Sequence, residues 1–162
     1  MLARYHQIKF GFLLIIVILV GCNHNNDTIN VSAELERLNL NHSKWNSLNV
    51  STYSYHFHRG CFCGPESTRK VIITVSQQLI TDIQPDVAAG EDTTPIPTEQ
   101  YSYYETVESL FTYLENAIKE HPFKLIVTYD SQYGAPTYIY VDPIEFAVDE
   151  EESFSLSIDW VT

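Results

Sequence analysis

Two cysteines and two histidines lie close together between His56 and Cys63, and they are the side chains best able to do chemistry. Cys61 and Cys63 are separated by one residue, as are His56 and His58. Two close thiols can form a disulfide, exchange it with other thiols or bind a metal. Two imidazoles on one face of a strand can share an ion, but a metal site needs further ligands that this stretch does not supply.

The cysteine pair leaves three interpretations open: a structural disulfide or buried thiol pair, a redox-active pair, and a metal or cross-chain role. The sequence contains no βαβ pattern in which a cysteine pair opens a helix, and this favours the structural interpretation. Across one residue of an extended strand, the two Cα atoms would lie about 6.6 Å apart, near the upper limit for a disulfide. A bridge therefore needs a bend, which Gly60 and Gly64-Pro65 make possible.

Acidic residues in the last third of the chain could supply oxygen ligands for calcium. They are Asp130, Asp142 and the run 149–152. No twelve-residue loop with ligands at alternating positions is present, and Asp130 and Asp142 also fit turns. We therefore predict no cofactor and treat His56, His58, Asp130 and Asp142 only as candidate metal ligands.

Common catalytic signatures do not occur in the chain. We find no Gly-x-Ser-x-Gly, no His-Glu-x-x-His and no phosphate-binding loop. This argues against an enzyme, and it leaves no residue predicted as catalytic.

The first 21 residues have the pattern of a secretory signal. Arg4 and Lys9 precede an apolar run at 10–20, and Gly21-Cys22 follows it. A small residue directly before a cysteine resembles the lipobox of bacterial lipoproteins. That resemblance implies cleavage after Gly21 and acylation of Cys22 with a diacylglycerol and an N-acyl chain such as palmitate, which anchor a soluble domain to a membrane. An uncleaved anchor or a secreted protein is the alternative.

Charge limits the possible partners. The chain has 21 acidic and 9 basic residues, and its formal net charge is −12. Such a surface repels nucleic-acid phosphates and anionic headgroups, so nucleic-acid binding is disfavoured. With Cys22 acylated, the other two cysteines can pair only with each other or with another chain, in a compartment where disulfides persist.

Periodicity predicts the elements that position these residues. The alternating run Tyr53 to Cys63 is typical of one long strand whose aromatic face must be covered. Helical spacing predicts a helix at 32–47, capped by Ser32, and another that Thr106 opens and His121-Pro122 ends. Further strands are predicted at 69–76, 79–84, 123–129, 136–141 and 154–161. Between them, 86–105 is an irregular segment. Its tyrosines either pack its end back onto the body or form an exposed cluster that could contact a partner.

The order α-β-β-β-α-β-β-β predicts an α+β fold. Short connections make the strands pair antiparallel, so we expect a sheet of about six strands with two helices packed on one face. The chain then divides into a signal peptide at 1–21, a flexible polar tether at 22–30 and a single globular domain at 31–162.

A series of short motifs resembles the DUF6174 family, small bacterial proteins many of which carry lipoprotein signals. The motifs are Trp45, Tyr53-Ser-Tyr55, Arg59-Gly-Cys-Phe-Cys63, Thr106-Val-Glu-Ser-Leu-Phe111, Tyr129-Asp130, Tyr133-Gly-Ala-Pro136, Ile139-Tyr-Val-Asp142 and Asp149-Glu150. The resemblance extends from about Trp45 to the end, although Ala135 replaces the tyrosine usual between Gly134 and Pro136. It implies an extracytoplasmic single domain and no particular activity, because the function of the family is unknown.

These observations together predict a lipoprotein of the bacterial cell envelope that is a non-enzymatic binding or structural module. Acyl chains on Cys22 would attach it to a membrane, on the periplasmic side of the outer membrane if the host has two membranes. A protein partner is possible but unidentified. The alternative is an extracytoplasmic thiol-disulfide or metal-handling protein that uses Cys61 and Cys63, with His56 and His58 nearby.

Overall fold

A computed structural model describes residues 29–147 and 149–162, in which a single six-stranded sheet carries two helices. All neighbouring strands are antiparallel, in the order β3-β2-β1-β6-β5-β4. The strands are β1 (Thr52–Gly60), β2 (Val71–Ser76), β3 (Leu79–Pro85), β4 (Lys124–Tyr129), β5 (Pro136–Asp142) and β6 (Glu152–Val161).

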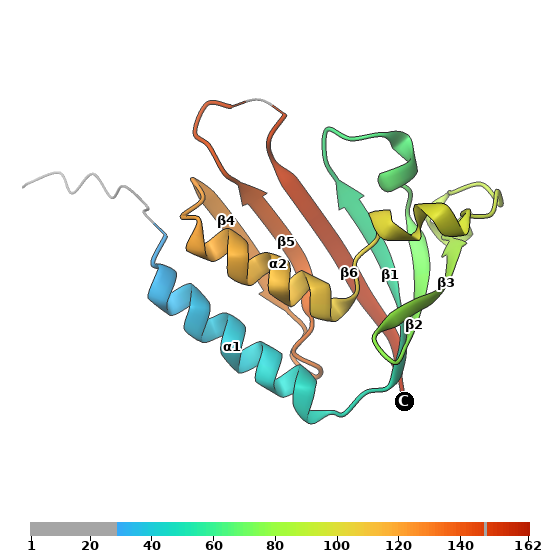
Figure 1. The fold of residues 1–162 in the computed structure, drawn as a ribbon, viewed down its shortest axis with the longest axis horizontal. Helices are drawn as coiled ribbons and strands as arrows, with labels where there is room; N and C mark the ends of the chain where they lie inside the picture. The colour runs from blue at the N-terminus through green and yellow to red at the C-terminus, as the bar shows by residue number, and fades with distance from the viewer. Residues whose placement is uncertain (1–28, 148) are drawn as a thin grey trace, which may run out of the picture.

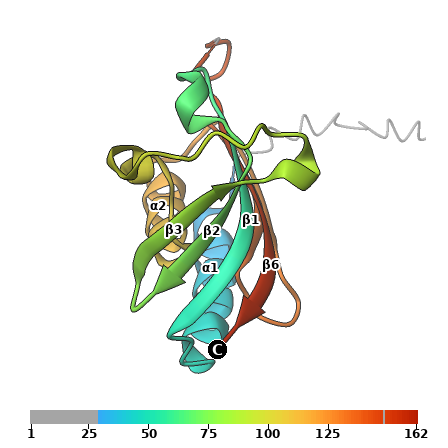
Figure 2. The ribbon, with the colours of Figure 1, turned by 90° about the vertical axis from the view of Figure 1, so that its right-hand side faces the viewer.

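Both helices cover the same face of the sheet (Figures 1 and 2). Helix α1 (Val31–Ser47) precedes β1, and α2 (Val107–Lys119) connects β3 at one edge of the sheet with β4 at the other. The predicted α+β class, element order and one-sided helix packing are therefore confirmed. Within residues 29–147 and 149–162, neither of the two α-helices lies on the other face of the sheet.

The core lies between the helices and the aromatic face of β1. Tyr53, Tyr55 and Phe57 are almost completely buried there, as their alternation predicts. From α2, every apolar position of the predicted helical repeat is buried as well: Val107, Leu110, Phe111, Leu114, Ala117 and Ile118. Strand β1 is central because it pairs with β2 on one side and β6 on the other.

The helix starts are fixed by side-chain caps. Thr106 Oγ1 accepts a hydrogen bond from the Ser109 backbone N–H, 3.0 Å away, as expected for the residue that opens α2. The predicted cap of α1 is wrong: Asn30 Oδ1, not Ser32, accepts from the Ala33 backbone N–H at 3.1 Å. Asparagine is as good a cap as serine, so the apolar spacing alone could not choose between them.

Three other expectations need correction. Strand β1 ends at Gly60 instead of continuing to Cys63, because the chain bends at 61–63. Strict alternation along the predicted strand 154–161 would place Trp160 on the same buried face as Phe154, but an irregularity in the pairing of β1 with β6 shifts the alternation and leaves Trp160 43 % exposed. The strand predicted at 123–129 begins one residue later, at Lys124, and Phe123 is exposed.

The segment 86–105 is less irregular than expected, since it contains the short 3₁₀ helices η2 (Val87–Ala89) and η3 (Thr98–Tyr103). Its tyrosines pack back onto the body in part. Tyr104 is buried and Tyr101 packs against the core, but Tyr103 is exposed. Tyr101 Oη also accepts from the Ile83 backbone N–H on the edge strand β3, 3.2 Å away.

Candidate functional site

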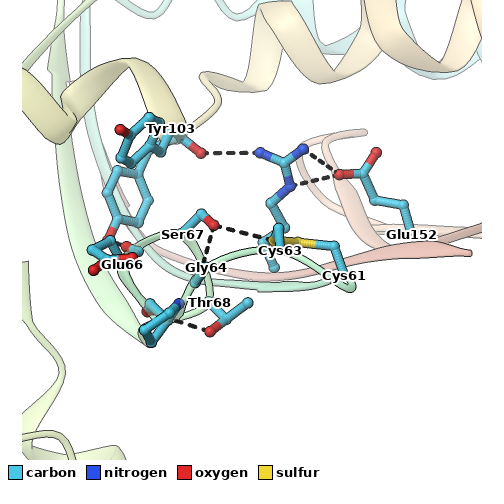
Figure 3. The surroundings of a disulfide bond; sticks show 11 residues. Cys61, Cys63, Gly64, Glu66, Ser67, Thr68, Tyr103 and Glu152 are labelled. Atoms are coloured by element: carbon cyan, nitrogen blue, oxygen red, sulfur yellow. Dashed lines mark hydrogen bonds and ion pairs between the residues drawn. A yellow bond between two sulfur atoms is a disulfide. The ribbon is translucent and has the colours of Figure 1, made fainter. Parts of the chain in front are cut away.

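The Cys61–Cys63 pair lies at the end of β1, in the bend that follows Gly60 (Figure 3). The sulfur atoms are within bonding distance of each other, and the Cα atoms are 5.2 Å apart. This separation lies in the usual disulfide range, and the bend shortens it from the value for an extended strand. Cys61 is half-buried and Cys63 is exposed. The structure thus brings the two predicted cysteines together at the surface.

Ser67 supports the second cysteine. It ends the short 3₁₀ helix η1 (Pro65–Ser67) and is buried. Its hydroxyl lies 3.1 Å from Cys63 Sγ and 2.9 Å from the Gly64 carbonyl oxygen. One hydroxyl proton can serve only one of these acceptors at a time, and a carbonyl oxygen is a better acceptor than a disulfide sulfur.

Two contacts fasten this loop to the rest of the molecule. Tyr104 Oη donates to the Glu66 carbonyl oxygen at 2.9 Å. Arg59, the penultimate residue of β1, donates from Nε to Glu152 Oε1 at 2.5 Å and from its guanidinium to the Tyr103 carbonyl oxygen (Figure 3). Tyr104, directly after η3, therefore holds the loop, and Arg59 joins the end of β1 to η3 and to the start of β6.

A cleft of about 320 Å³ opens beside Cys61. Its lining combines the cysteine with two aromatic side chains and three acids: Gly60, Cys61, Phe62, Tyr140, Asp149, Glu151, Glu152 and Ser153. Arg59 pairs with Glu152. Within the part of the chain that the structure describes, Asp149 and Glu151 have no cation at salt-bridge distance. The lining of the cleft therefore carries a net negative charge.

A larger cleft of about 480 Å³ lies between the end of α2 and β5, lined among others by Tyr113, Glu120 and Glu150. Burial and the neighbouring Glu152 raise the pKa of Tyr113 far above its usual value, so this phenol stays protonated. Since no thiol or imidazole lines this cleft, the smaller one beside Cys61 is the better candidate for chemistry.

His56 lies between two carboxylates. Its Nδ1 is 2.6 Å from Asp86 Oδ2 and its Nε2 is 3.1 Å from Asp159 Oδ1. The Asp86 hydrogen bond, with a contribution from Asp159, raises the pKa of His56, and the same bond lowers the pKa of the buried Asp86. A charged imidazolium suits this place, because only that form can donate from both nitrogens. His56 is thus an ion-pair partner here.

The candidate metal ligands do not come together. His58 stands opposite Ser155 on β6. Asp130 precedes the β4–β5 turn and accepts from the backbone N–H groups of residues 132 and 133, whereas Asp142 ends β5 at the other end of the sheet. Residues 29–147 and 149–162 contain no group of three or more His, Cys, Asp or Glu side chains that could hold a metal ion.

Cys22, the predicted acylation site, lies outside the described residues. Within 29–147 and 149–162, no helix has the length and apolar character needed to cross a bilayer.

Sequence reasoning missed the residues that surround the cysteines and His56. Ser67 follows Cys63 by four residues, but nothing marks its hydroxyl as a sulfur contact. Asp86 and Asp159 pair with His56, and Glu152 pairs with Arg59. Strand pairing and the path of the loops bring these residues together, and the spacing of residues in a single sequence does not predict either. The alternation of β1 is the one available signal: it places His56 on the face of the strand opposite the aromatic side chains, where polar partners are expected.

Comparison with known proteins shows the family of this chain. A family model described as "Family of unknown function (DUF6174)" matches residues 37–158, which is more than half of the chain. No curated protein and no solved structure matches it.

Proposed function

Since the chain belongs to the DUF6174 family, whose function is unknown, we propose a role from its own residues: it is a lipoprotein of the bacterial cell envelope, anchored through acylated Cys22. The folded domain acts as a non-enzymatic binding or structural module outside the cytoplasm. Binding to a partner protein in that compartment stays a prediction.

One observation carries the proposal, namely the order of features at 1–22. A cationic start, an apolar run and a small residue before Cys22 follow one another with the spacing that a lipoprotein signal requires. No apolar run of comparable length occurs elsewhere in the chain. Two or three acyl chains on one cysteine give lasting membrane attachment, since a single chain gives only marginal binding.

The distance from Cys22 to the domain supports an anchored arrangement. Helix α1 begins at Val31, so eight residues lie between Cys22 and the helix. The nine Cα–Cα steps from Cys22 to Val31 span at most about 30 Å when fully extended. The domain would therefore stay within about one domain diameter of the membrane surface.

Cell fractionation with Cys22→Ser tests the proposal. The wild-type protein should sediment with membranes and be released by detergent. The Cys22→Ser variant should lose acylation and keep an uncleaved signal, because the lipid-linked cysteine defines the cleavage site. A matched control is Cys61→Ser/Cys63→Ser, which should remain in the membrane fraction with an acylated N-terminus. Wild-type protein in the soluble fraction would contradict the proposal.

A second candidate function is thiol-disulfide exchange at Cys61 and Cys63, and the Ser67 contact with Cys63 Sγ favours it. A hydroxyl within hydrogen-bond distance of a sulfur can stabilise a departing thiolate, and Cys63 is exposed. Counting free thiols before and after treatment with dithiothreitol tests this function. A bridge that opens without denaturant supports it, and a bridge that resists reduction in the folded protein removes it.

A further inference from the structure

We propose that Cys61 is the sulfur that an incoming thiol attacks, that Cys63 is the leaving thiolate, and that the cleft beside Cys61 selects positively charged thiols. This inference rests on the second candidate function, thiol-disulfide exchange. It adds the direction of the reaction and the class of substrate.

The position of the cleft favours attack at Cys61. Cys61 lines the cleft, together with Phe62 and Tyr140, whereas Cys63, although it is the more exposed of the two cysteines, does not. Attack on a disulfide needs a clear approach to one sulfur, with the other sulfur as leaving group. A thiol that enters the cleft therefore meets Cys61 first.

The surroundings of the two sulfurs favour departure of Cys63. A thiolate on Cys63 can accept the Ser67 hydroxyl, 3.1 Å away, which turns from the Gly64 carbonyl as negative charge develops. This hydrogen bond strengthens only as the bond breaks, so it lowers the barrier. A thiolate left on Cys61 would instead lie in the cleft that Asp149 and Glu151 line, where like charges disfavour it.

The same carboxylates determine which thiols enter. An anionic thiol is repelled from a cleft lined by acids, and a cationic one is attracted. The net charge of the chain, −12, likewise attracts cationic thiols and repels anionic ones. The natural substrate would accordingly be a pair of thiols in an extracytoplasmic polypeptide, with basic residues beside the attacking cysteine.

The reaction balances without any further reagent. A substrate thiolate attacks Cys61 Sγ, a new S–S bond forms, the Cys61–Cys63 bond breaks and Cys63 leaves as a thiolate. The second substrate thiolate attacks the substrate sulfur of this mixed disulfide and releases Cys61. The substrate dithiol is oxidised by two electrons to a disulfide, the protein pair is reduced to two thiols, and the two substrate protons pass to them.

Three small thiols of similar size test the direction and the selectivity. The oxidised full-length protein in detergent reacts with cysteamine, 2-mercaptoethanol or 3-mercaptopropionate at equal thiolate concentration and low salt. An acid quench traps early mixed disulfides, and tandem mass spectrometry locates the adduct. We expect the adduct on Cys61. Cysteamine should react faster than 3-mercaptopropionate by about tenfold or more, and this ratio of rates should be smaller at high salt.

Matched variants separate the two parts of the inference. In the Asp149→Asn/Glu151→Gln variant, the ratio of the cysteamine rate to the 3-mercaptopropionate rate should fall close to the ratio that the wild-type protein shows at high salt. Glu36→Gln/Glu99→Gln removes the same number of charges from exposed positions outside the cleft and should leave most of the ratio. Ser67→Ala should slow all three thiols by about tenfold without changing the ratio, and Ser67→Thr should restore most of the rate.

An adduct mainly on Cys63, or equal rates for the three thiols, would overturn the inference while leaving thiol-disulfide exchange intact. A protein that forms no mixed disulfide with any of them would overturn the inference and the second candidate function together. The proposed envelope lipoprotein is unaffected by either result, because Cys22 takes no part in this reaction.

Discussion

His56 shows how a single residue couples three parts of the chain that are distant in sequence. It sits on β1, and its two carboxylate partners come from the end of β3 and from β6. The contact with Asp86 is the shorter one, and Asp86 is also the more buried partner. The ion pair therefore contributes to stability only where His56 is protonated and Asp86 is ionised.

The sign of this effect follows from the two pKa shifts. The pKa of His56 is raised, so its contribution is complete below about pH 6.5 and is lost as pH rises through the folded-state value. The pKa of Asp86 is lowered, so its contribution is present above about pH 4 and is lost as pH falls through its folded-state value. The pair is most effective between these limits.

We predict that His56→Gln lowers the free energy of unfolding more at about pH 5.5 than at about pH 9. Because the imidazole is partly exposed, the difference should not exceed about 1 kcal/mol. Urea unfolding at the two pH values measures it. His58→Gln is the control, since its ring contacts no carboxylate in the part of the chain that the structure describes. An equal loss at both pH values would contradict this account of His56.

Glu108 is the residue that joins both helices to the sheet. Its Oε1 accepts from Trp45 Nε1 at 3.1 Å and its Oε2 from Tyr53 Oη at 2.6 Å. Trp45 and Tyr53 are both buried, and burial, followed by the Glu108 charge, raises the pKa of Tyr53 well above its usual range, so it remains a donor. Tyr53 Oη also accepts from the Val107 backbone N–H at the start of α2.

We predict that Glu108→Ala lowers the free energy of unfolding by about 2–4 kcal/mol, because it leaves two buried donors without their charged acceptor. Glu115→Ala is the control in the same helix, where removal of an exposed pair with Lys119 should cost about 0.5 kcal/mol or less. Chemical denaturation measures both variants. A Glu108→Ala loss no larger than that of the control would show that the contacts of Glu108 do not stabilise the fold.

At the scale of elements, α1 packs closely on the turn between β4 and β5. Gly134 has φ +82°, and a Cβ at this position would lie 2.6 Å from the Asn41 carbonyl oxygen of α1. Nearby, Arg37 of α1 donates to the Val127 carbonyl oxygen of the edge strand β4 at 3.1 Å. Arg37 thus engages one backbone carbonyl of the edge strand β4, and Tyr101 engages one backbone N–H of the edge strand β3 on the other side of the sheet.

We predict that Gly134→Ala costs about 2–4 kcal/mol, the sum of a left-handed backbone and a forced separation of α1 from the turn. Gly90→Ala is a matched control, since Gly90 has φ +92° but open space around its Cβ position, and it should cost only about 1 kcal/mol. Thermal unfolding compares the two. Equal losses would mean that the helix does not approach the turn as closely as the structure shows.

Most elements could be predicted from the sequence, because apolar residues alternate along much of each strand and α2 has six apolar residues at helical spacing. The failures have local causes. An irregularity in strand pairing exposes Trp160, and a bend ends β1 before Cys61. Both depend on neighbouring strands, and the periodicity of one strand carries no information about its neighbours. For the same reason the candidate site was predicted only as a cysteine pair, and its Ser67 donor and acidic cleft were not.

At the scale of the whole molecule, the core and not the bridge carries the stability. A disulfide that closes a loop of three residues restrains the unfolded chain very little, and the chain-entropy relation gives about 1.6 kcal/mol. The buried aromatic face of β1 and the apolar face of α2 form a continuous core. We therefore expect the core to contribute more to the free energy of unfolding than this disulfide does.

We predict that Cys61→Ser/Cys63→Ser lowers the free energy of unfolding by about 1–2 kcal/mol. Leu114→Ala, which truncates a fully buried side chain of α2, should cost more, about 2–5 kcal/mol. Urea unfolding of both variants under oxidising conditions makes the comparison. A loss on removing the bridge that exceeds the Leu114→Ala loss would assign the cysteines a structural role and weaken the case for exchange.

The central claim concerns the whole molecule and its place in the cell, and the mass of the native N-terminal peptide tests it most directly. The account predicts a chain that begins at Cys22 and carries a thioether-linked diacylglycerol with an N-acyl group. A native chain that begins at Met1 with an unmodified Cys22 would contradict it.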